Sequence, residues 1–278
     1  MQTPTSLGII AGNGVYPRLV AQSARRAGVS RIVAAAFTDE TDPQLEQLVD
    51  ATEWMRVGQL GRLINYFKSA GIRHAIMAGQ IAPKNLFDLR PDMKALVLLA
   101  RLKQRNAESM FGAIADELAN VGVELLPATT FMDEFLAPAG NIAGRGLSRR
   151  EEADVEFGFT IAKEVSRLDI GQTVIVKGGT VLAVEAFEGT NDALRRGGAL
   201  AKSGAVMVKV SKPNQDLRFD VPVIGPETLR IAAEAKLRVI AVEAGVTLLL
   251  EKHSLGEIAA QGGITLVGRS VPLSATAS

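Results

Sequence analysis

Two aspartates lie four residues apart around an arginine in the stretch QDLRFDVPVIG, which begins at Gln215. In an extended segment, residues four apart face the same way, so Asp216 and Asp220 could point to one site with Arg218 beside them. Two carboxylates on one face, without histidine or cysteine, suit a hard divalent cation and phosphate chemistry. The alternative is a surface loop in which an aspartate pairs with Arg218.

A second group of polar residues surrounds an expected β-hairpin over residues 172–187. Glu185 lies in an apolar strand, where an unpaired carboxylate is costly, so we expect a partner such as a metal ion or a lysine. Lys177 and Thr190 flank the same hairpin, and Lys209 precedes the acidic stretch. We expect Thr190 to contact the substrate, although a threonine at this position could be no more than a helix N-cap.

A glycine loop, LGIIAGNG, lies near the N-terminus between an expected strand and an expected helix. Backbone N–H groups in such a loop can approach a phosphate. The dinucleotide fingerprint would have a third glycine where this chain has Pro17, so a nucleotide-phosphate site of another kind is favoured. Two further loops follow expected strands, whose carboxyl ends line the ligand crevice in an open parallel sheet. The residues selected for this shared pocket are Gly12, Asn13, Gly14, Gln59, Gly79, Gln80 and Lys84. The alternatives are a plain strand–helix turn, glycines that serve as helix caps and, around Lys84, a solvated loop.

The composition excludes several classes of protein and site. The 278 residues include 31 basic and 30 acidic side chains, with a net charge of +1, which argues against a nucleic-acid binder. There is no cysteine and there are only two histidines, so any metal should be held by oxygen ligands, which favours Mg²⁺ or Mn²⁺. No signal-peptide pattern and no run of roughly 18 apolar residues is visible. We expect a soluble, cytoplasmic protein that can still touch a membrane surface.

The elements that must position these residues fall into two halves. In the first half, apolar runs alternate with amphipathic segments that end in glycine, which predicts a Rossmann-like parallel sheet with helices on its faces. The second half combines helices, a hairpin around Gly178-Gly179 and further strands, which predicts an α+β domain with a mixed sheet. We therefore predict an α/β protein with an N-terminal nucleotide- or substrate-binding domain (1–135), a linker (136–150) and a C-terminal catalytic domain (151–278).

Six stretches resemble one family, in the same order and along nearly the whole chain. They are LGIIAGNGVYP, VGQLGRL, MAGQIAPKNLFDLRPD, VIVKGGTVLAVEAFEGTNDALRR, VKVSKPNQDLRFDVPVIGPETL and AVEAGVTLLLE. These motifs are similar to those of the LpxI type of UDP-2,3-diacylglucosamine pyrophosphatase. The resemblance implies two domains with the ligand between them. It implies metal-dependent hydrolysis of UDP-2,3-diacylglucosamine to UMP and 2,3-diacylglucosamine 1-phosphate (lipid X), with attack at the phosphorus on the sugar-lipid side. This is a step of lipid A biosynthesis in Gram-negative bacteria.

The resemblance also assigns residues. It makes Asp220, the second aspartate of the motif QDxRxDxPxxG, essential for catalysis. Asp216, Gln215 and Glu185 fall on matching acidic or amide positions. On this interpretation Asp220, with help from Asp216 or Glu185, holds Mg²⁺ (or Mn²⁺) against the pyrophosphate.

The remaining expectations complete this interpretation. Lys177 and Lys209 would stabilise the leaving phosphate, and the N-terminal glycine loops would hold the uridine diphosphate. We also expect a homodimer and peripheral contact with the cytoplasmic face of the inner membrane. Two alternatives remain open: an oxidoreductase that uses the N-terminal glycine loop, and a non-catalytic binder of nucleotide or lipid.

Overall fold

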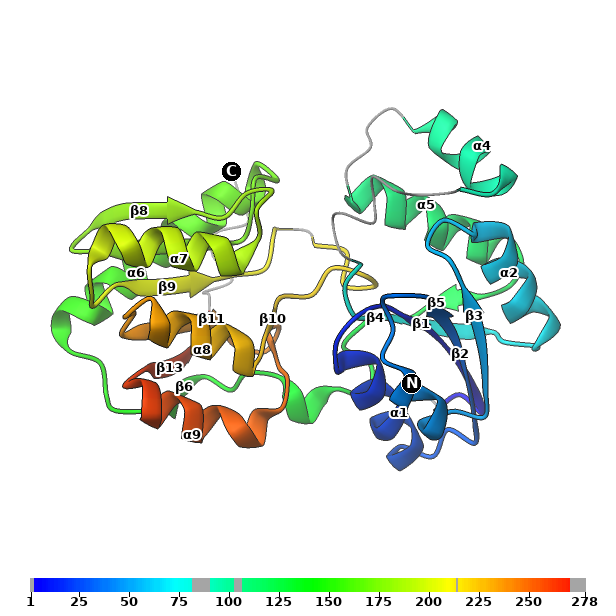
Figure 1. Cartoon of the computed structure of the whole chain (residues 1–278), viewed down its shortest axis with the longest axis horizontal. Helices are drawn as coiled ribbons and strands as arrows, with labels where there is room; N and C mark the ends of the chain where they lie inside the picture. The colour runs from blue at the N-terminus through cyan, green and yellow to red at the C-terminus, as the bar shows by residue number, and fades with distance from the viewer. Residues whose placement is uncertain (1–2, 82–90, 103–106, 214, 271–278) are drawn as a thin grey trace. The chain divides into compact units, whose positions relative to one another are not determined.

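The chain forms two compact units (Figure 1). The computed structural model describes residues 3–81, 91–102, 107–213 and 215–270. Unit 1 comprises Met1–Asp133 and Asp216–Asp220, and unit 2 comprises Glu134–Gln215 and Val221–Ser278. The short segment 216–220, which carries the two aspartates, therefore belongs by its contacts to unit 1 although unit 2 flanks it on both sides in sequence.

Unit 1 is built on a five-stranded parallel sheet with the strand order β3-β2-β1-β4-β5. Its strands are β1 (Ser6–Ala11), β2 (Arg31–Phe37), β3 (Ala51–Met55), β4 (His74–Ala78) and β5 (Glu124–Leu125). Five of the six residues of β1 are buried, because helices cover both faces of a parallel sheet. The order in which strands are added reverses between β1 and β4: β2 and β3 lie on one side of β1, and β4 and β5 lie on the other. Their carboxyl ends form the switch point at which such sheets bind ligands.

Helices flank this sheet. They are α1 (Tyr16–Arg26), the 3₁₀ helix η1 (Pro43–Leu48), α2 (Leu60–Ser69), α4 (Met93–Arg101) and α5 (Ala107–Ala119). Pro17 lies in the first turn of α1, where its missing N–H breaks no helical hydrogen bond. Phe67 of α2 and Leu118 of α5 are fully buried in one core. A second 3₁₀ helix, η2 (Asp133–Phe135), follows where the chain leaves unit 1.

Unit 2 contains a six-stranded mixed sheet with the order β6-β13-β11-β9-β7-β8. The strands are β6 (Gly140–Ala143), β7 (Thr173–Lys177), β8 (Thr180–Val184), β9 (Val206–Lys209), β11 (Val239–Glu243) and β13 (Thr265–Arg269). Strands β9, β11 and β13 are parallel, whereas β6, β7 and β8 pair in antiparallel fashion. A small parallel pair, β10 (Val223–Ile224) and β12 (Leu248–Leu249), completes the unit.

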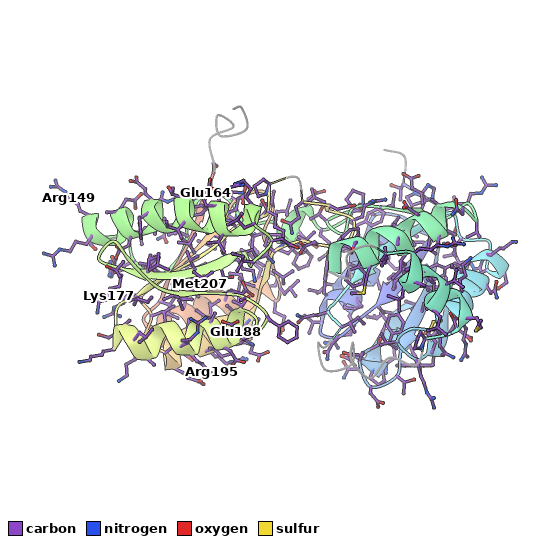
Figure 2. The ribbon with its side chains drawn as sticks, turned by 90° about the horizontal axis from the view of Figure 1, so that it is seen from above. Arg149, Glu164, Lys177, Glu188, Arg195 and Met207 are labelled. Atoms are coloured by element: carbon purple, nitrogen blue, oxygen red, sulfur yellow. The ribbon has the colours of Figure 1, made fainter. Side chains whose placement is uncertain are left out.

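Helices cover both faces of the mixed sheet. The helix α6 (Arg149–Arg167) packs on one face, and α7 (Thr190–Ala201), α8 (Pro226–Glu234) and α9 (Lys252–Gly262) pack on the other. Successive strand residues alternate between the faces: Met207 joins the core beneath α7, and Val208 joins the core beneath α6. In Figure 2, Met207 lies between α6, which carries Glu164, and α7, which carries Arg195. The predicted α/β class, with a Rossmann-like parallel sheet and a second mixed sheet, is confirmed.

Residues 136–150, which the composition predicts to be a linker, are ordered parts of unit 2. They include β6, which pairs with β13. They also include Ser148, the N-cap of α6, whose side chain accepts a hydrogen bond from the N–H of Glu151 while the Glu151 side chain accepts from the N–H of Ser148. This reciprocal arrangement is a capping box. Gly140 belongs to β6, and Gly144, with a φ of +81°, lies in the bend that follows this strand.

Candidate functional site

Four residues selected from the sequence meet at the carboxyl ends of β1 and β4. Asn13 and Gln80 form an isolated bridge in which the N–H of Asn13 donates to the carbonyl oxygen of Gln80 at 2.7 Å. A Cβ on Gly79 would lie 2.5 Å from the carbonyl oxygen of Asn13, and one on Gly12 would lie 2.8 Å from that of Gln80. Only glycine permits so close an approach of two backbones. The structure thus brings Gly12, Asn13, Gly79 and Gln80 together at the switch point. The close contact of the two loops also explains why glycine is required at both positions, whether or not a ligand binds there.

The other residues of the N-terminal group have different surroundings. Gly14 has a φ of +87°, and a Cβ at this position would meet nothing within 4 Å, so a left-handed turn explains the glycine. The side chain of Gln59 accepts a hydrogen bond from the N–H of Arg56 at 2.8 Å and closes the turn before α2. Lys84 lies outside the described residues.

The segment 216–220 forms a turn, so the expectation of an extended backbone is wrong. The N–H groups of Phe219 and Asp220 both donate to the carbonyl oxygen of Asp216, at 3.3 and 3.1 Å. Phe219 packs against the core of unit 1, and its ring centroid lies 5.7 Å from that of Phe111. The half-buried aromatic ring therefore anchors the turn that carries both aspartates.

Asp216 and Arg218 form a two-pronged ion pair within this turn. The Nε of Arg218 donates to Oδ1 of Asp216 at 2.9 Å, and its Nη2 donates to Oδ2 at 2.6 Å. The hydrogen bonds from Arg218 hold the pKa of Asp216 below its usual value, although burial acts in the opposite direction. The same pairing raises the pKa of Arg218. Since both carboxylate oxygens of Asp216 are engaged, this residue is better suited to holding the turn than to binding a metal.

Three selected residues of unit 2 form one hydrogen-bonded chain at the first turn of α7. The Nζ of Lys209 donates to Oγ1 of Thr190 at 2.8 Å, and that hydroxyl donates to Oε1 of Glu185 at 2.7 Å. Met207 and Ala183 belong to the core beneath α7. Lys209 follows Met207 by two residues, and Glu185 follows Ala183 by two residues. Because side chains two apart in a strand share a face, both charged side chains also point toward α7. Lys209 is 6 % exposed and Glu185 is 8 % exposed. The partner that Glu185 requires is therefore Thr190 and, through it, Lys209.

This cluster has unused hydrogen-bonding capacity. Among the described residues, Oε2 of Glu185 and the hydroxyl of Thr173 are buried without a hydrogen-bond partner. Thr173 lies directly between the two charges: it pairs with Lys209 in the sheet, and its carbonyl accepts from the N–H of Glu185 at 2.8 Å. Buried polar atoms usually find a protein, water or ligand partner. Two hydrogen-bonding atoms of the cluster therefore remain unused.

Lys177 lies at the other end of α7. Its Nζ donates to the carbonyl oxygens of Ala201 at 3.0 Å and Ser203 at 2.7 Å, where a cation complements the carboxyl end of the helix. The helix α7 has 12 residues, so its two ends lie about 18 Å apart. Lys177, labelled in Figure 2, and Lys209 therefore do not share a site.

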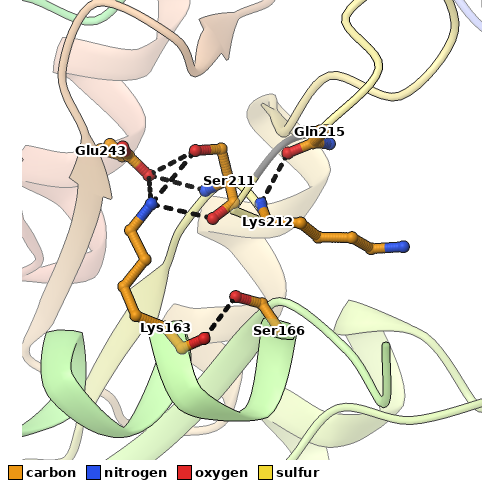
Figure 3. A network of polar contacts seen from close by, with 6 residues as sticks. All are labelled: Lys163, Ser166, Ser211, Lys212, Gln215 and Glu243. Atoms are coloured by element: carbon orange, nitrogen blue, oxygen red, sulfur yellow. Dashed lines mark hydrogen bonds and ion pairs between the residues drawn. The ribbon is translucent and has the colours of Figure 1, made fainter. Parts of the chain in front are cut away.

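A second polar network, on the α6 side of the sheet, escapes prediction from the sequence (Figure 3). Oε2 of Glu243 accepts hydrogen bonds from Nζ of Lys163 at 2.7 Å, from the N–H of Ser211 at 2.7 Å and from the Ser211 hydroxyl at 2.8 Å. Glu243 ends β11, and Ser211 follows β9, so the network ties the carboxyl ends of two parallel strands to α6. The one signal in the sequence is a polar residue at the end of each apolar strand. However, nothing in the sequence links Lys163 to a partner 80 residues away.

The chain that follows Ser211 is also held within unit 2. The N–H of Lys212 donates to Oε1 of Gln215 at 2.7 Å, and the Lys212 ammonium pairs with Asp169. Gln215 is the last residue of unit 2 before the chain enters the turn of unit 1. These contacts therefore hold the segment around Ser211, Lys212 and Gln215 within unit 2.

The residues selected as metal ligands do not form a preformed centre within either unit. Asp216 and Asp220 belong to unit 1 and Glu185 to unit 2. Across the described parts of the chain, no group of three His, Asp or Glu side chains is placed to hold a metal ion. Mg²⁺, however, is usually held by one or two carboxylates together with substrate phosphates. Since both carboxylate oxygens of Asp216 are engaged by Arg218, Asp216 does not add a ligand to such a set.

The sequences of both units, the doubly wound one and the three-layer one with the mixed sheet, match the two domains of one family. The LpxI N-terminal domain matches residues 6–135, and the LpxI C-terminal domain matches residues 138–267. The UDP-2,3-diacylglucosamine pyrophosphatase LpxI of Caulobacter vibrioides is 30% identical over 273 residues, which cover 94% of this chain and 96% of that protein. The chain belongs to the LpxI family.

Two solved structures show a remote similarity to this chain. The biotin carboxylase domain of the 2-oxoglutarate carboxylase of Hydrogenobacter thermophilus is 15% identical with a TM-score of 0.28, over 65% of this chain and 36% of that one. The biotin carboxylase subunit of pyruvate carboxylase is 15% identical with a TM-score of 0.27, over 65% and 35%. The chain spans about a third of the length of these proteins, and likenesses at this level carry no argument about it.

Proposed function

We propose that this chain hydrolyses the pyrophosphate bond of UDP-2,3-diacylglucosamine to UMP and 2,3-diacylglucosamine 1-phosphate, as a step of lipid A biosynthesis in a Gram-negative bacterium. The observation that carries the proposal is the match to the Caulobacter vibrioides pyrophosphatase over 94% of this chain and 96% of that protein. Both domain families are present in order. An activity that needs both domains therefore has both of them here.

In the proposed reaction, the switch point of unit 1 binds the uridine diphosphate. The loops that contain Gly12, Asn13, Gly79 and Gln80 lie at the carboxyl ends of β1 and β4, the position at which doubly wound sheets bind nucleotides. Main-chain N–H groups in such loops can approach a phosphate because glycine has no side chain. This assignment is supported by position, and a nucleotide-binding measurement tests it.

Lys209 acts as the cation that stabilises the departing phosphate. Lys209 is only 6 % exposed. A charge acts on a phosphate more strongly when little water screens it. Thr190 and Glu185 hold that ammonium through the hydrogen-bonded chain described above. We assign Thr190 and Glu185 as positioning residues. Lys177 has no role in this proposal, because it binds carbonyl groups at the carboxyl end of α7.

Dependence on Mg²⁺ or Mn²⁺ is part of the proposal, and Asp220 is the residue that would hold the ion. The metal would supply neutralisation of the pyrophosphate charge and activation of a water molecule. Asp216 contributes by pairing with Arg218 and so holding the turn on which Asp220 stands.

A cytoplasmic location, contact with the inner membrane and a homodimer complete the proposal. They rest on the family resemblance, and sedimentation equilibrium of the purified protein measures the number of subunits.

The test is UMP release from UDP-2,3-diacylglucosamine dispersed in detergent with Mg²⁺. We expect UMP to appear, to stop appearing when EDTA is added, and to return when Mg²⁺ or Mn²⁺ is restored. Full activity in a thoroughly metal-free sample would contradict the metal dependence. Tight substrate binding without UMP would contradict the hydrolase and favour a non-catalytic binder.

A further inference from the structure

We infer that the outward face of α4 docks on an anionic lipid surface. This helix buries Ala95 and Leu98 in the core of unit 1, yet Met93, Leu96 and Val97 are 75%, 47% and 45% exposed. The three exposed side chains stand at positions i, i+3 and i+4, which lie on one face of a helix. The result is an apolar stripe that no described residue covers.

The stripe is displayed on a helix that is firmly held. Asp92 caps α4, since its Oδ1 accepts from the N–H of Ala95 at 2.9 Å, and its Oδ2 accepts from the N–H of Gly61 in α2 at 2.7 Å. The Nζ of Lys94 pairs with Oε2 of Glu117 in α5 at 2.8 Å. Because both neighbouring helices anchor α4, the exposure of its apolar face is a property of the folded unit.

The size of the stripe favours a lipid surface over a second protein. Three partly exposed side chains offer on the order of a few hundred Å², whereas a stable protein interface buries about 800 Å² on each partner. A helix that lies in a membrane interface inserts only one apolar face, to a depth of about 5–10 Å. No helix in the described ranges is long and apolar enough to cross a membrane.

Charge and substrate favour the same occupant. The sequence of α4, MKALVLLAR, contains two basic residues and no acidic one. Lys94 is paired with Glu117, and Arg101, in the last turn, is exposed to solvent, where it can meet anionic head groups. The inference rests on the proposed function, because a substrate with two acyl chains resides in a membrane and the enzyme must reach it there.

Co-sedimentation with lipid vesicles that contain no substrate tests the inference. We expect the wild-type protein to bind vesicles of phosphatidylcholine with phosphatidylglycerol, and to bind pure phosphatidylcholine more weakly. Met93→Ser combined with Leu96→Ser should weaken binding by on the order of tenfold, and Arg101→Glu should remove the preference for the anionic vesicles. The matched control is Leu168→Ser combined with Leu200→Ser, which alters two exposed leucines of unit 2 that are 59% and 61% exposed; it should bind like the wild type.

Three outcomes would overturn the inference: a wild-type protein that ignores vesicles, an α4 variant that binds normally, or a control that loses as much binding as the α4 variant. Conversion of a wild-type dimer to a monomer by the α4 changes would also overturn it, since the stripe would then be a subunit contact. Melting temperatures check folding, and Val97→Ser provides a milder variant. UMP release from detergent-dispersed substrate should be equal in the wild type and the α4 variant. A failure of UMP release in both would contradict the proposed function without altering the vesicle result.

Discussion

The candidate sites of the two units are built from different parts of the polypeptide. At the switch point of unit 1, two loops cross so closely that their glycines admit no Cβ, and main-chain groups dominate. In unit 2, charged side chains dominate: Lys209 and Glu185 are buried beneath α7, and Glu243 is half-buried beneath α6. Main-chain groups can fit a ligand at little electrostatic cost, whereas a buried charge acts strongly on a phosphate but is costly when unpaired. We therefore expect changes at the switch point of unit 1 to alter binding, and changes at Asp220 or at the charges of unit 2 to alter turnover.

The largest effect is expected from Asp220, the one residue of the unit 1 turn that we assign to the chemistry. Asp220→Asn keeps the size of the side chain but removes its charge, so turnover should fall at least a hundredfold, about 3 kcal/mol or more. Asp216→Asn, in the same turn, is the matched control; it breaks the pair with Arg218 and should cost no more than about 1 kcal/mol of stability. Turnover and melting temperature of both variants measure this. A folded Asp220→Asn protein with near-normal turnover would remove Asp220 from the mechanism.

Lys209 should come next. Lys209→Met removes the cation and leaves the buried Glu185 without compensation, so we expect a turnover loss on the order of 10- to 100-fold. The free energy of unfolding should fall by about 3–5 kcal/mol. Adding Glu185→Leu should restore most of the stability, because an apolar pair can replace a buried ion pair, but it should not restore turnover. Recovery of turnover in the double variant would mean that Lys209 is structural.

Glu243 tests whether a residue remote from the substrate positions the chain that leads to Asp220. Glu243→Gln removes the charge that Lys163 and Ser211 share, and we expect turnover to fall roughly tenfold while KM changes by less than about twofold. The control is Asp154→Asn, a buried carboxylate of α6 that accepts from the N–H groups of Gly178 and Gly179 at 2.8 Å each. It should lose similar stability without losing turnover. Equal turnover losses in the two variants would reduce the network to a purely structural role.

The switch point of unit 1 should respond differently from Asp220 and from the charges of unit 2. Gly79→Ala places a Cβ 2.5 Å from the carbonyl oxygen of Asn13 at a φ of +89°, so it should lower stability by about 2–3 kcal/mol and raise the KM for the substrate. Gly14→Ala shares the positive φ of +87° but meets nothing within 4 Å; it should cost about 1 kcal/mol. A fall in kcat without a change in KM for Gly79→Ala would break the contrast between the units.

The smallest effect is expected at Lys177. Lys177→Met removes a cation from the carboxyl end of α7, which should lower stability by about 0.5–1 kcal/mol and leave turnover unchanged. A loss as large as that of Lys209→Met would show that both ends of α7 serve the reaction.

The local sequence was sufficient to predict an element where a strand is buried on both faces of the sheet or where glycines mark a turn. The apolar runs of β1, β2 and β4 predicted a parallel sheet, and Gly178-Gly179 marked the hairpin of β7 and β8. It was insufficient for β6, whose four residues lie in a glycine-containing stretch and form a strand only by pairing with β13 more than 120 residues later. The prediction of an extended backbone over residues 216–220 was wrong for the same reason. The contact of Phe219 with the core of unit 1 decides the shape of this segment.

The polar clusters show the same limit of prediction from local sequence, which does not reveal contacts between distant residues. Glu185 stood out because a carboxylate in an apolar strand needs a partner, and it has one in Thr190. Lys163 and Glu243 did not stand out, because Lys163 alone resembles a solvated residue of its helix and Glu243 alone resembles the solvated end of its strand. Only the folded sheet places α6 beside β11 and brings the two charges within 2.7 Å.

The most direct test of the central claim is the reaction of the wild-type protein with UDP-2,3-diacylglucosamine and Mg²⁺ in H₂¹⁸O, followed by mass spectrometry of both products. Hydrolysis at the phosphorus next to the sugar predicts unlabelled UMP and 2,3-diacylglucosamine 1-phosphate that carries one heavy oxygen from water. Label in UMP would move the attack to the uridine side, and the absence of UMP would contradict the assignment of this chain as a pyrophosphatase.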